Sequence, residues 1–272
     1  VANGIAMSSN GNLALVDGTG LASNYSLNST VINIAKRVLN SSGSKLYDSN
    51  TNALAGAITL SNLVSGEALN HSGTASTSSA NVGSYTISNL TGITIADGSG
   101  GTASNYTLTG GTHNFAINQR PLNATLARQY DGTTNAAGSD LSSFDALQGG
   151  ETLTLSGSGT AANDNVANGI SVSSLGSLAL VNGTGLASNY SLNSAAINIT
   201  QRVLNSSGSK TYDANTNALA ADITLSNLVS GEALNHSGTA SISSANAGSY
   251  TITNLAGITI ADGSGGAASN YT

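Results

Sequence analysis

The sequence predicts an all-β protein, a tandem array of immunoglobulin-like antiparallel β-sandwich repeats, and three observations lead to this prediction. Apolar and polar residues alternate with a period of two, as at Thr152–Leu155 and Ile170–Val172, which is typical of short strands with one buried face. Turn-forming pairs such as Asp97-Gly98 bound these runs. The Tyr-Asp pair recurs at Tyr47, Tyr130 and Tyr212, that is, 83 and 82 residues apart, a length that suits a small two-sheet sandwich.

The repeats divide the 272 residues into four segments. Residues 1–107 match residues 166–272 at a constant offset of 165, and two types of unit alternate. Because the chain begins and ends inside a unit, we expect it to be a window from a longer repetitive polypeptide, with any targeting signal outside it. The predicted segments are the C-terminal part of a truncated repeat, two whole repeats and a truncated repeat, at 1–35, 36–118, 119–200 and 201–272.

A parallel β-helix is the alternative architecture, because its composition is similar. A β-helix predicts self-similarity at roughly 20 residues per coil, whereas Tyr-Asp, Gly-Glu and Ser-Asn-Tyr each occur once per unit. The sandwich is therefore favoured. No flexible linker separates the units, since strand-like residues run through each junction, as at Ile197–Leu204. We therefore expect a stiff string of domains.

The composition excludes several classes of protein. The chain has no Cys, so it has neither disulfides nor thiolate metal sites. Only 7 % of its residues are charged, against about 25 % in ordinary domains. The net charge of −6 argues against nucleic-acid binding, which needs a basic face. No apolar run approaches the length of a membrane span, so we expect no membrane insertion.

A small set of charged and aromatic residues recurs in the repeats and forms the candidate structural motif. Arg and Asp are 11 residues apart in every unit, and we expect a hairpin at Ser42-Gly43 and Ser207-Gly208 to bring them together as a clamp at the junction. The motif consists of Arg37, Tyr47, Asp48, Glu67, Tyr106, Arg120, Tyr130, Asp131, Glu151, Tyr190, Arg202, Tyr212, Asp213 and Glu232.

We predict no enzymatic activity and no cofactor. His71 and His236 are equivalent positions, and Leu155 replaces them in the 119–200 unit, which favours a packing role over that of a base or ligand. Calcium is the one metal considered, because acidic repeats often bind it, but Asp17 becomes Asn182 in the later copy. A carboxylate that is dispensable in this way indicates a turn rather than a metal site.

The motifs resemble a known repeat family. Tyr130-Asp-Gly-Thr-Thr-Asn-Ala136, followed by Gly150–Gly157 and Ala187–Leu192, resembles the YDG repeat, and Gly83–Ile87 resembles the related MBG-type variant. Units 36–118 and 201–272 depart from the pattern, because no Gly follows their Tyr-Asp pair. On this resemblance, units 36–118 and 201–272 are MBG-like variants and unit 119–200 is of the YDG type.

The resemblance implies filamentous-haemagglutinin-like bacterial adhesins, often exported by two-partner secretion, in which such repeats form a surface stalk. The expected function is therefore a structural stalk or filament segment, secreted to the cell surface and involved in adhesion or biofilm matrix. The expected partners are neighbouring repeats, other copies in a filament and a host or matrix glycan. The alternative function is that each repeat itself binds glycan or mucin weakly and acts through avidity.

Overall fold

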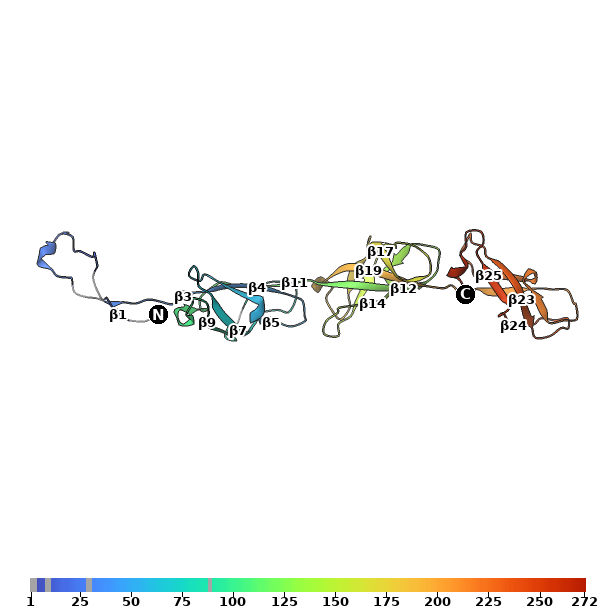
Figure 1. The fold of residues 1–272 in the computed structure, drawn as a ribbon, viewed down its shortest axis with the longest axis horizontal. Coiled ribbons are helices and arrows are strands. Elements are labelled where there is room, and N and C mark those ends of the chain that lie inside the picture. Colours follow the sequence, from blue (N-terminus) through green and yellow to red (C-terminus); the bar gives the residue numbers. More distant parts are fainter. Residues whose placement is uncertain (1–3, 8–10, 28–30, 88–89) are drawn as a thin grey trace. The chain divides into compact units, whose positions relative to one another are not determined.

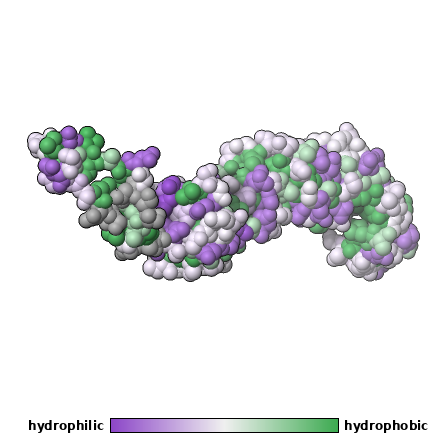
Figure 2. Space-filling view, turned by 60° about the vertical axis from the view of Figure 1, so that its left-hand side comes forward, coloured by the Kyte–Doolittle hydropathy of each residue, from purple (hydrophilic) through white to green (hydrophobic). Residues whose placement is uncertain are grey.

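The computed structural model describes residues 4–7, 11–27, 31–87 and 90–272, which form two compact units, Val1–Gln119 and Arg120–Thr272 (Figure 1). Strands dominate both units, and every helix in the described residues is a three-residue 3₁₀ turn. Among these residues, none belongs to a helix with the length and apolarity needed to cross a membrane. Figure 2 shows hydrophilic and hydrophobic residues interspersed over the visible face.

The first unit contains a complete two-sheet sandwich. Its four-stranded sheet has the order β6-β4-β11-β8, and its three-stranded sheet has the order β5-β7-β9. A further pair, β3 and β10, joins the beginning of the repeat to the residues that precede its last strand. The strands are β3 (Arg37–Val38), β4 (Asn40–Leu46), β5 (Asn52–Leu54), β6 (Ile58–Ser61), β7 (Leu69–Ser76), β8 (Gly83–Thr86), β9 (Ile93–Asp97), β10 (Tyr106–Thr107) and β11 (His113–Asn118).

The alternating sequence of β11 places its side chains as the period-two pattern predicts. Phe115 and Ile117 are buried, Ala116 between them is half-buried, and the flanking Asn114 and Asn118 are exposed. β11 lies between two neighbours and pairs parallel with β4 and antiparallel with β8. Most pairings are antiparallel, as predicted, but the first and last strands of the repeat run parallel. The sandwich is confirmed, and its two sheets exclude the β-helix alternative.

The second unit begins with a sandwich of the same plan. β14 (Leu141–Phe144), β12 (Arg120–Gln129), β19 (Tyr190–Thr200) and β17 (Ala167–Ser174) are neighbours in one sheet, with β12 and β19 parallel. β16 connects this sheet to β13, and β15 pairs with β18. These shorter strands are β13 (Asn135–Ala137), β15 (Leu153–Ser156), β16 (Ser158–Ala161) and β18 (Ala179–Asn182).

The 201–272 repeat, also in the second unit, contains fewer strands. β20 pairs with β22, and β23 pairs with β21, β24 and β25. Its strands are β20 (Asn205–Gly208), β21 (Asn217–Leu219), β22 (Ile223–Ser226), β23 (Asn235–Ile242), β24 (Ile252–Asn254) and β25 (Ile258–Ala261).

Short 3₁₀ turns precede the tyrosine of every Ser-Asn-Tyr motif. In residues 4–7, 11–27 and 31–35, the same motif accompanies a single antiparallel pair, β1 (Ile5–Ala6) with β2 (Val31–Ile32). The turns of this type are η1 (Ala22–Asn24), η3 (Ala103–Asn105), η5 (Ala187–Asn189) and η7 (Ala268–Asn270). The remaining turns are η2 (Ala55–Ala57), η4 (Gly138–Asp140) and η6 (Ala220–Asp222).

The predicted hairpin at Ser42-Gly43 is wrong, because β4 runs without a break from Asn40 to Leu46. Gly43 serves a packing role instead and lies directly opposite Phe115. A Cβ atom at Gly43 would lie 2.2 Å from the Ala57 carbonyl oxygen and 2.9 Å from the Phe115 ring. In the next repeat, Leu126 pairs with Ile197. The close approach of a glycine and an aromatic ring thus belongs to the first repeat, and two aliphatic side chains meet at the same place in the next.

The predicted Ser207-Gly208 hairpin is also wrong, since both residues lie within β20, which pairs with β22 over its whole length. Tyr85, at the start of β8, forms a tyrosine corner. Its hydroxyl donates a hydrogen bond to the Asn81 carbonyl oxygen at 2.8 Å, four residues upstream, as such a corner requires.

Replacing Gly43 by alanine tests the close approach of β4 and β11. We expect Gly43→Ala to lower the free energy of unfolding by about 1–3 kcal/mol, the usual cost of overpacking a core. Gly56→Ala is the matched control, because no atom lies within 4 Å of a Cβ there, and should change it by less than about 0.5 kcal/mol. Denaturant unfolding measures both, and equal values for the two variants would contradict the packing role.

Candidate functional site: the tyrosine–glutamate junction

The parallel pairing at the start of each repeat places its arginine beside its Ser-Asn-Tyr tyrosine. Arg37 pairs with Tyr106 and Arg120 pairs with Tyr190. Arg202 and Tyr271 form the equivalent parallel bridge in the 201–272 repeat. These residues are far apart in the sequence, and the first and last strands of the fold bring them together.

Each of these tyrosines donates its hydroxyl hydrogen to the glutamate of the same repeat. Tyr190 bonds Glu151 at 2.7 Å and Tyr271 bonds Glu232 at 2.5 Å. Tyr106 makes the same bond to Glu67. The hydroxyl oxygen also accepts a backbone N–H, at 3.0–3.1 Å, from the loop that carries the glutamate. Both functions of the hydroxyl are therefore used in every repeat.

The arginine holds the other side of this loop. The Nε of Arg37 donates to the Asn62 carbonyl oxygen at 2.6 Å, and the Nε of Arg202 donates to that of Asn227 at 2.7 Å. Arg120 donates in the same way to Ala146 at 3.1 Å. Arginine, tyrosine and glutamate thus form one polar cluster per repeat, which we call the Arg–Tyr–Glu cluster.

Within the second unit, this cluster also receives a tyrosine from the preceding repeat. Tyr130 donates its hydroxyl hydrogen to Oε1 of Glu232 at 2.6 Å, while Tyr271 bonds Oε2 of the same carboxylate. The two rings pack edge to face, with centroids 5.5 Å apart at an angle of 80°. Tyr130 is only 4 % exposed and Tyr271 only 1 %. One carboxylate therefore joins the 119–200 and 201–272 repeats, and we call this arrangement the tyrosine–glutamate junction.

Backbone and amide groups extend the junction on either side. The N–H of Val166 donates to Oδ1 of Asn270 at 2.9 Å, and Nδ2 of Asn270 donates to Oδ1 of Asn165 at 3.1 Å. Gly132 packs so closely that a Cβ atom there would lie 2.8 Å from Cγ1 of Val229. The glycine of the Tyr-Asp-Gly motif therefore leaves room for the following repeat.

The turn after Tyr-Asp keeps its conformation in the repeats that lack glycine. Gly132 has a φ of +70°, and its counterparts Ser49 and Ala214 both have a φ of +62°. A non-glycine residue in this left-handed region costs about 1–2 kcal/mol. Replacement of the glycine by serine or alanine therefore raises the conformational free energy of the turn but leaves its backbone geometry unchanged.

The buried tyrosine hydroxyls hold their protons tightly. Burial, reinforced by the hydrogen bond to Glu232, raises the pKa of Tyr130 to about 12. Burial and the bond to Glu151 raise the pKa of Tyr190 to the same value. The pKa of Tyr106 rises mainly because of its bond to Glu67, and burial raises that of Tyr271. The glutamates thus act as acceptors for neutral phenols.

The predicted pairing of the repeated arginines with the repeated aspartates is wrong. Asp48 pairs with Lys45 at 2.7 Å, Asp213 pairs with Lys210 at 2.8 Å, and Asp131 pairs with Arg128. The reason is the straight run of β4 and its counterparts. Eleven residues of extended chain span roughly 36 Å, so Arg37 and Asp48 lie at opposite ends of their repeat. Each aspartate instead stabilises its own turn through a local pair.

The structure therefore divides the fourteen predicted residues into three groups. The arginines, glutamates and Ser-Asn-Tyr tyrosines form the Arg–Tyr–Glu clusters, and Tyr130 completes the junction. The aspartates lie in local turns. The remaining two tyrosines of the Tyr-Asp pair differ, since Tyr47 is buried and Tyr212 is 64 % exposed. Sequence reasoning missed Asn62, Asn227 and the Tyr–Glu bonds themselves. The constant separation of 39 residues between each glutamate and its tyrosine was the available signal.

The histidines take part in structural hydrogen bonds. Nε2 of His71 donates to the Ala55 and Ile58 carbonyl oxygens at 3.0 and 2.9 Å, and His236 makes the equivalent contacts. Leu155 is buried at the equivalent position, in keeping with the predicted packing role. Within the described part of the chain, no three His, Asp or Glu side chains cluster as metal ligands would.

Removing the Tyr130 hydroxyl tests the junction. We expect Tyr130→Phe to lower the free energy of unfolding by about 1.5–3 kcal/mol, because hydrogen bonds to charged groups are worth this much. Tyr212→Phe is the matched control at the exposed copy of the same motif and should change it by less than about 0.5 kcal/mol. Thermal unfolding measures both, and equal effects would show that the bond to Glu232 contributes nothing.

Alkaline pH should weaken the same contact. The pKa of Tyr130 is about 12 in the folded protein against 10.0 ordinarily, so its stabilising effect is complete below pH 10. As the pH rises from 10 towards 12, only the unfolded chain releases the proton, and the free energy of unfolding falls. The stability difference between the wild type and Tyr130→Phe should therefore shrink over this range. Unfolding curves from pH 8 to 11.5 test this, and a constant difference would contradict it.

Comparison with known protein families finds the same three tandem repeats. The family model for the YDG domain matches residues 35–113, 118–199 and 197–272. The matches include both segments that resemble the MBG-type variant. No curated protein and no solved structure matches the chain. Since the three matches cover nearly all of the sequence, the chain belongs to the YDG domain family and carries three tandem copies of that domain.

Proposed function

We propose that this chain is a structural segment of a large secreted bacterial surface adhesin, where its repeats form a non-enzymatic stalk in adhesion or biofilm matrix. The observation that supports a stalk most strongly is the tyrosine–glutamate junction. Tyr130 and Tyr271 belong to different repeats and share the carboxylate of Glu232. Such a contact restrains one repeat against the next, as a stalk requires.

The connection between these repeats adds further restraint. β19 ends at Thr200, and the N–H of Arg202 already donates to the Asn270 carbonyl oxygen at 2.9 Å in the next repeat. The backbone N–H of Tyr130 donates to the Thr200 carbonyl oxygen at the same distance. The chain thus passes from one sandwich to the next through hydrogen-bonded residues, which favours a stiff connection over a flexible linker.

The non-enzymatic role is inferred from what the recurring polar side chains do. In each repeat the arginine donates to a carbonyl oxygen of the neighbouring loop, and the tyrosine donates to the glutamate. The tyrosines remain neutral at physiological pH, and the glutamates accept their hydrogens. These groups are therefore engaged in structure rather than poised to react with a substrate.

The secreted location rests on composition and on the family resemblance. Lack of cysteine and a charged content of only 7 % suit an extracellular repeat rich in small polar residues. The glycan-binding alternative has less support, because a stacking platform needs an exposed aromatic residue in every repeat. Tyr106, Tyr190 and Tyr271 are instead buried in their Arg–Tyr–Glu clusters.

Distance measurements between spin labels test the stalk. The chain has no cysteine, so labels can be attached at Ser142→Cys and Thr259→Cys, which are exposed sites in adjoining repeats. We expect a single narrow distance distribution that Glu232→Ala broadens. Glu67→Ala, the same change in the Arg–Tyr–Glu cluster of the first unit, is the control and should leave the distribution unchanged. A broad distribution in the unaltered chain would contradict the stalk.

A further inference from the structure

A glycine at the tyrosine–glutamate junction distinguishes the two alternating types of repeat. Gly132 follows the Tyr-Asp pair in the 119–200 repeat, whereas Ser49 and Ala214 stand at this position in the other two repeats. All three residues have a positive φ, between +62° and +70°. Since the turn accepts a side chain in two repeats, the turn alone does not explain Gly132.

The neighbour of Gly132 in the following repeat is Val229. A Cβ atom at Gly132 would lie 2.8 Å from Cγ1 of Val229, well inside the roughly 3.5–4.0 Å at which two carbon atoms pack. Val229 is half-buried and packs against the apolar cluster that contains Tyr130 and Tyr271. Its branched side chain has few alternative rotamers. The two residues therefore fit together because Gly132 has no side chain.

The position of Val229 also differs between the repeat types. Its counterpart in the 119–200 repeat is Gln148, and the backbone N–H of each donates to the tyrosine hydroxyl of its own cluster at 3.0 Å. The Gln148 side chain turns back onto its own loop, where Nε2 donates to the Ala146 carbonyl oxygen at 3.1 Å. Glutamine at this position is thus held within its own repeat, whereas valine packs against the preceding one.

The two positions change together along the sequence. The repeat that carries Ser49 is followed by the repeat that carries Gln148, and the repeat that carries Gly132 is followed by the one that carries Val229. Valine therefore comes after the residue without a side chain, and glutamine comes after a residue that has one. The close fit of Gly132 with Val229 provides a physical reason for this order.

We propose that the residue after the Tyr-Asp pair selects the type of repeat that follows. Glycine admits a repeat with valine three positions before its junction glutamate, and serine or alanine excludes that repeat by a clash. Such a repulsive contact is what discrimination between similar partners requires. Glutamine beside glycine would in turn leave the space of the valine side chain unfilled. This inference rests on the geometry of the junction and holds whether or not the repeats form a stalk.

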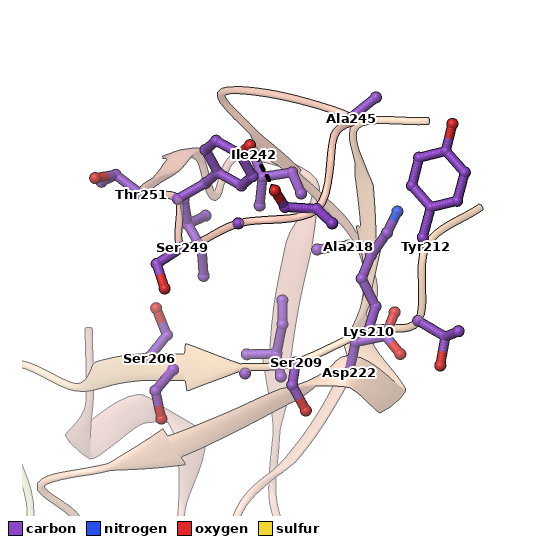
Figure 3. A pocket seen from close by; sticks show the side chains of 18 of the residues that line it. Ser206, Ser209, Lys210, Tyr212, Ala218, Asp222, Ile242, Ala245, Ser249 and Thr251 are labelled. Atoms are coloured by element: carbon purple, nitrogen blue, oxygen red, sulfur yellow. Dashed lines mark hydrogen bonds between the residues drawn. The ribbon is translucent and has the colours of Figure 1, made fainter. Parts of the chain in front are cut away.

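A pocket in the 201–272 repeat provides a control position away from this contact. Its volume is about 720 Å³, and neither Val229 nor Tyr271 lines it. Ile242 is among the residues that line it (Figure 3) and is half-buried and β-branched, as Val229 is. A glutamine at Ile242 therefore matches a glutamine at Val229 in chemistry but not in location.

A serine at position 132 tests the contact in the intact chain with spin labels at Ser142→Cys and Thr259→Cys. Gly132→Ser should broaden the distance distribution between the labels. Gly169→Ser is the matched control, because Gly169 has a φ of +69° in the same repeat and a Cβ atom there meets no atom within 4 Å. The control should leave the distribution unchanged. Gly132→Ser should also lower the midpoint of thermal unfolding by roughly 3–8 °C more than the control does.

Exchange of both residues tests the selectivity itself. Adding Val229→Gln to Gly132→Ser should restore the narrow distribution and most of the lost midpoint. The reason is that this glutamine can turn onto the Asn227 carbonyl oxygen, as Gln148 does onto that of Ala146. Adding Ile242→Gln instead should restore neither.

Two results would overturn the proposal. One is an equal effect of Gly132→Ser and Gly169→Ser, which would leave Gly132 with a role in the turn alone. The other is a Gly132→Ser/Val229→Gln chain that behaves no better than Gly132→Ser. If Gly132→Ser prevents folding, the double variant decides: a folded chain with a narrow distribution supports the selection, and an unfolded chain contradicts it.

Discussion

The shared carboxylate of Glu232 is the contact on which the arrangement of the two adjoining repeats depends. Glu232 is partly buried, and two tyrosines from different repeats donate hydrogen bonds to its carboxylate. Each donor is in place for a separate reason. Tyr271 follows η7 and pairs with Arg202. Tyr130 follows β12, which forms the longest strand pairing of its repeat with β19. The junction is therefore an extension of both sandwiches rather than a separate linker.

The two repeat types reach one fold through compensating substitutions. Phe115 lies opposite Gly43 in one repeat, and Ile197 lies opposite Leu126 in the next. His71 satisfies two carbonyl oxygens where the other type buries Leu155. Single core residues therefore differ between the repeat types while the strand pairing of the fold is kept. The arginine, tyrosine and glutamate of the Arg–Tyr–Glu cluster are the same in all three repeats.

Local patterns predicted the fold well and the polar contacts poorly. Alternation along β11 and the tyrosine corner at Tyr85 depend on neighbours in sequence, so they could be predicted from the sequence. The Tyr106–Glu67 bond joins residues 39 positions apart, and only the constant spacing indicated it. The predicted Arg37–Asp48 pair is wrong because residues 40–46 form one strand rather than a hairpin. A chain rich in Ser and Gly gives turn signals even inside strands.

The parallel pairing of β4 with β11 has a consequence for how a repeat responds to mechanical force. The chain enters the repeat along β4 and leaves it along β11, and the six paired positions from Ser41 to Leu46 join the two strands. Tension on the backbone pulls these strands in opposite directions along their common axis. All the hydrogen bonds of the ladder then resist together, whereas in a hairpin pulled open at its ends they would break one at a time. A sandwich that closes in this way is suited to withstand pulling along the chain.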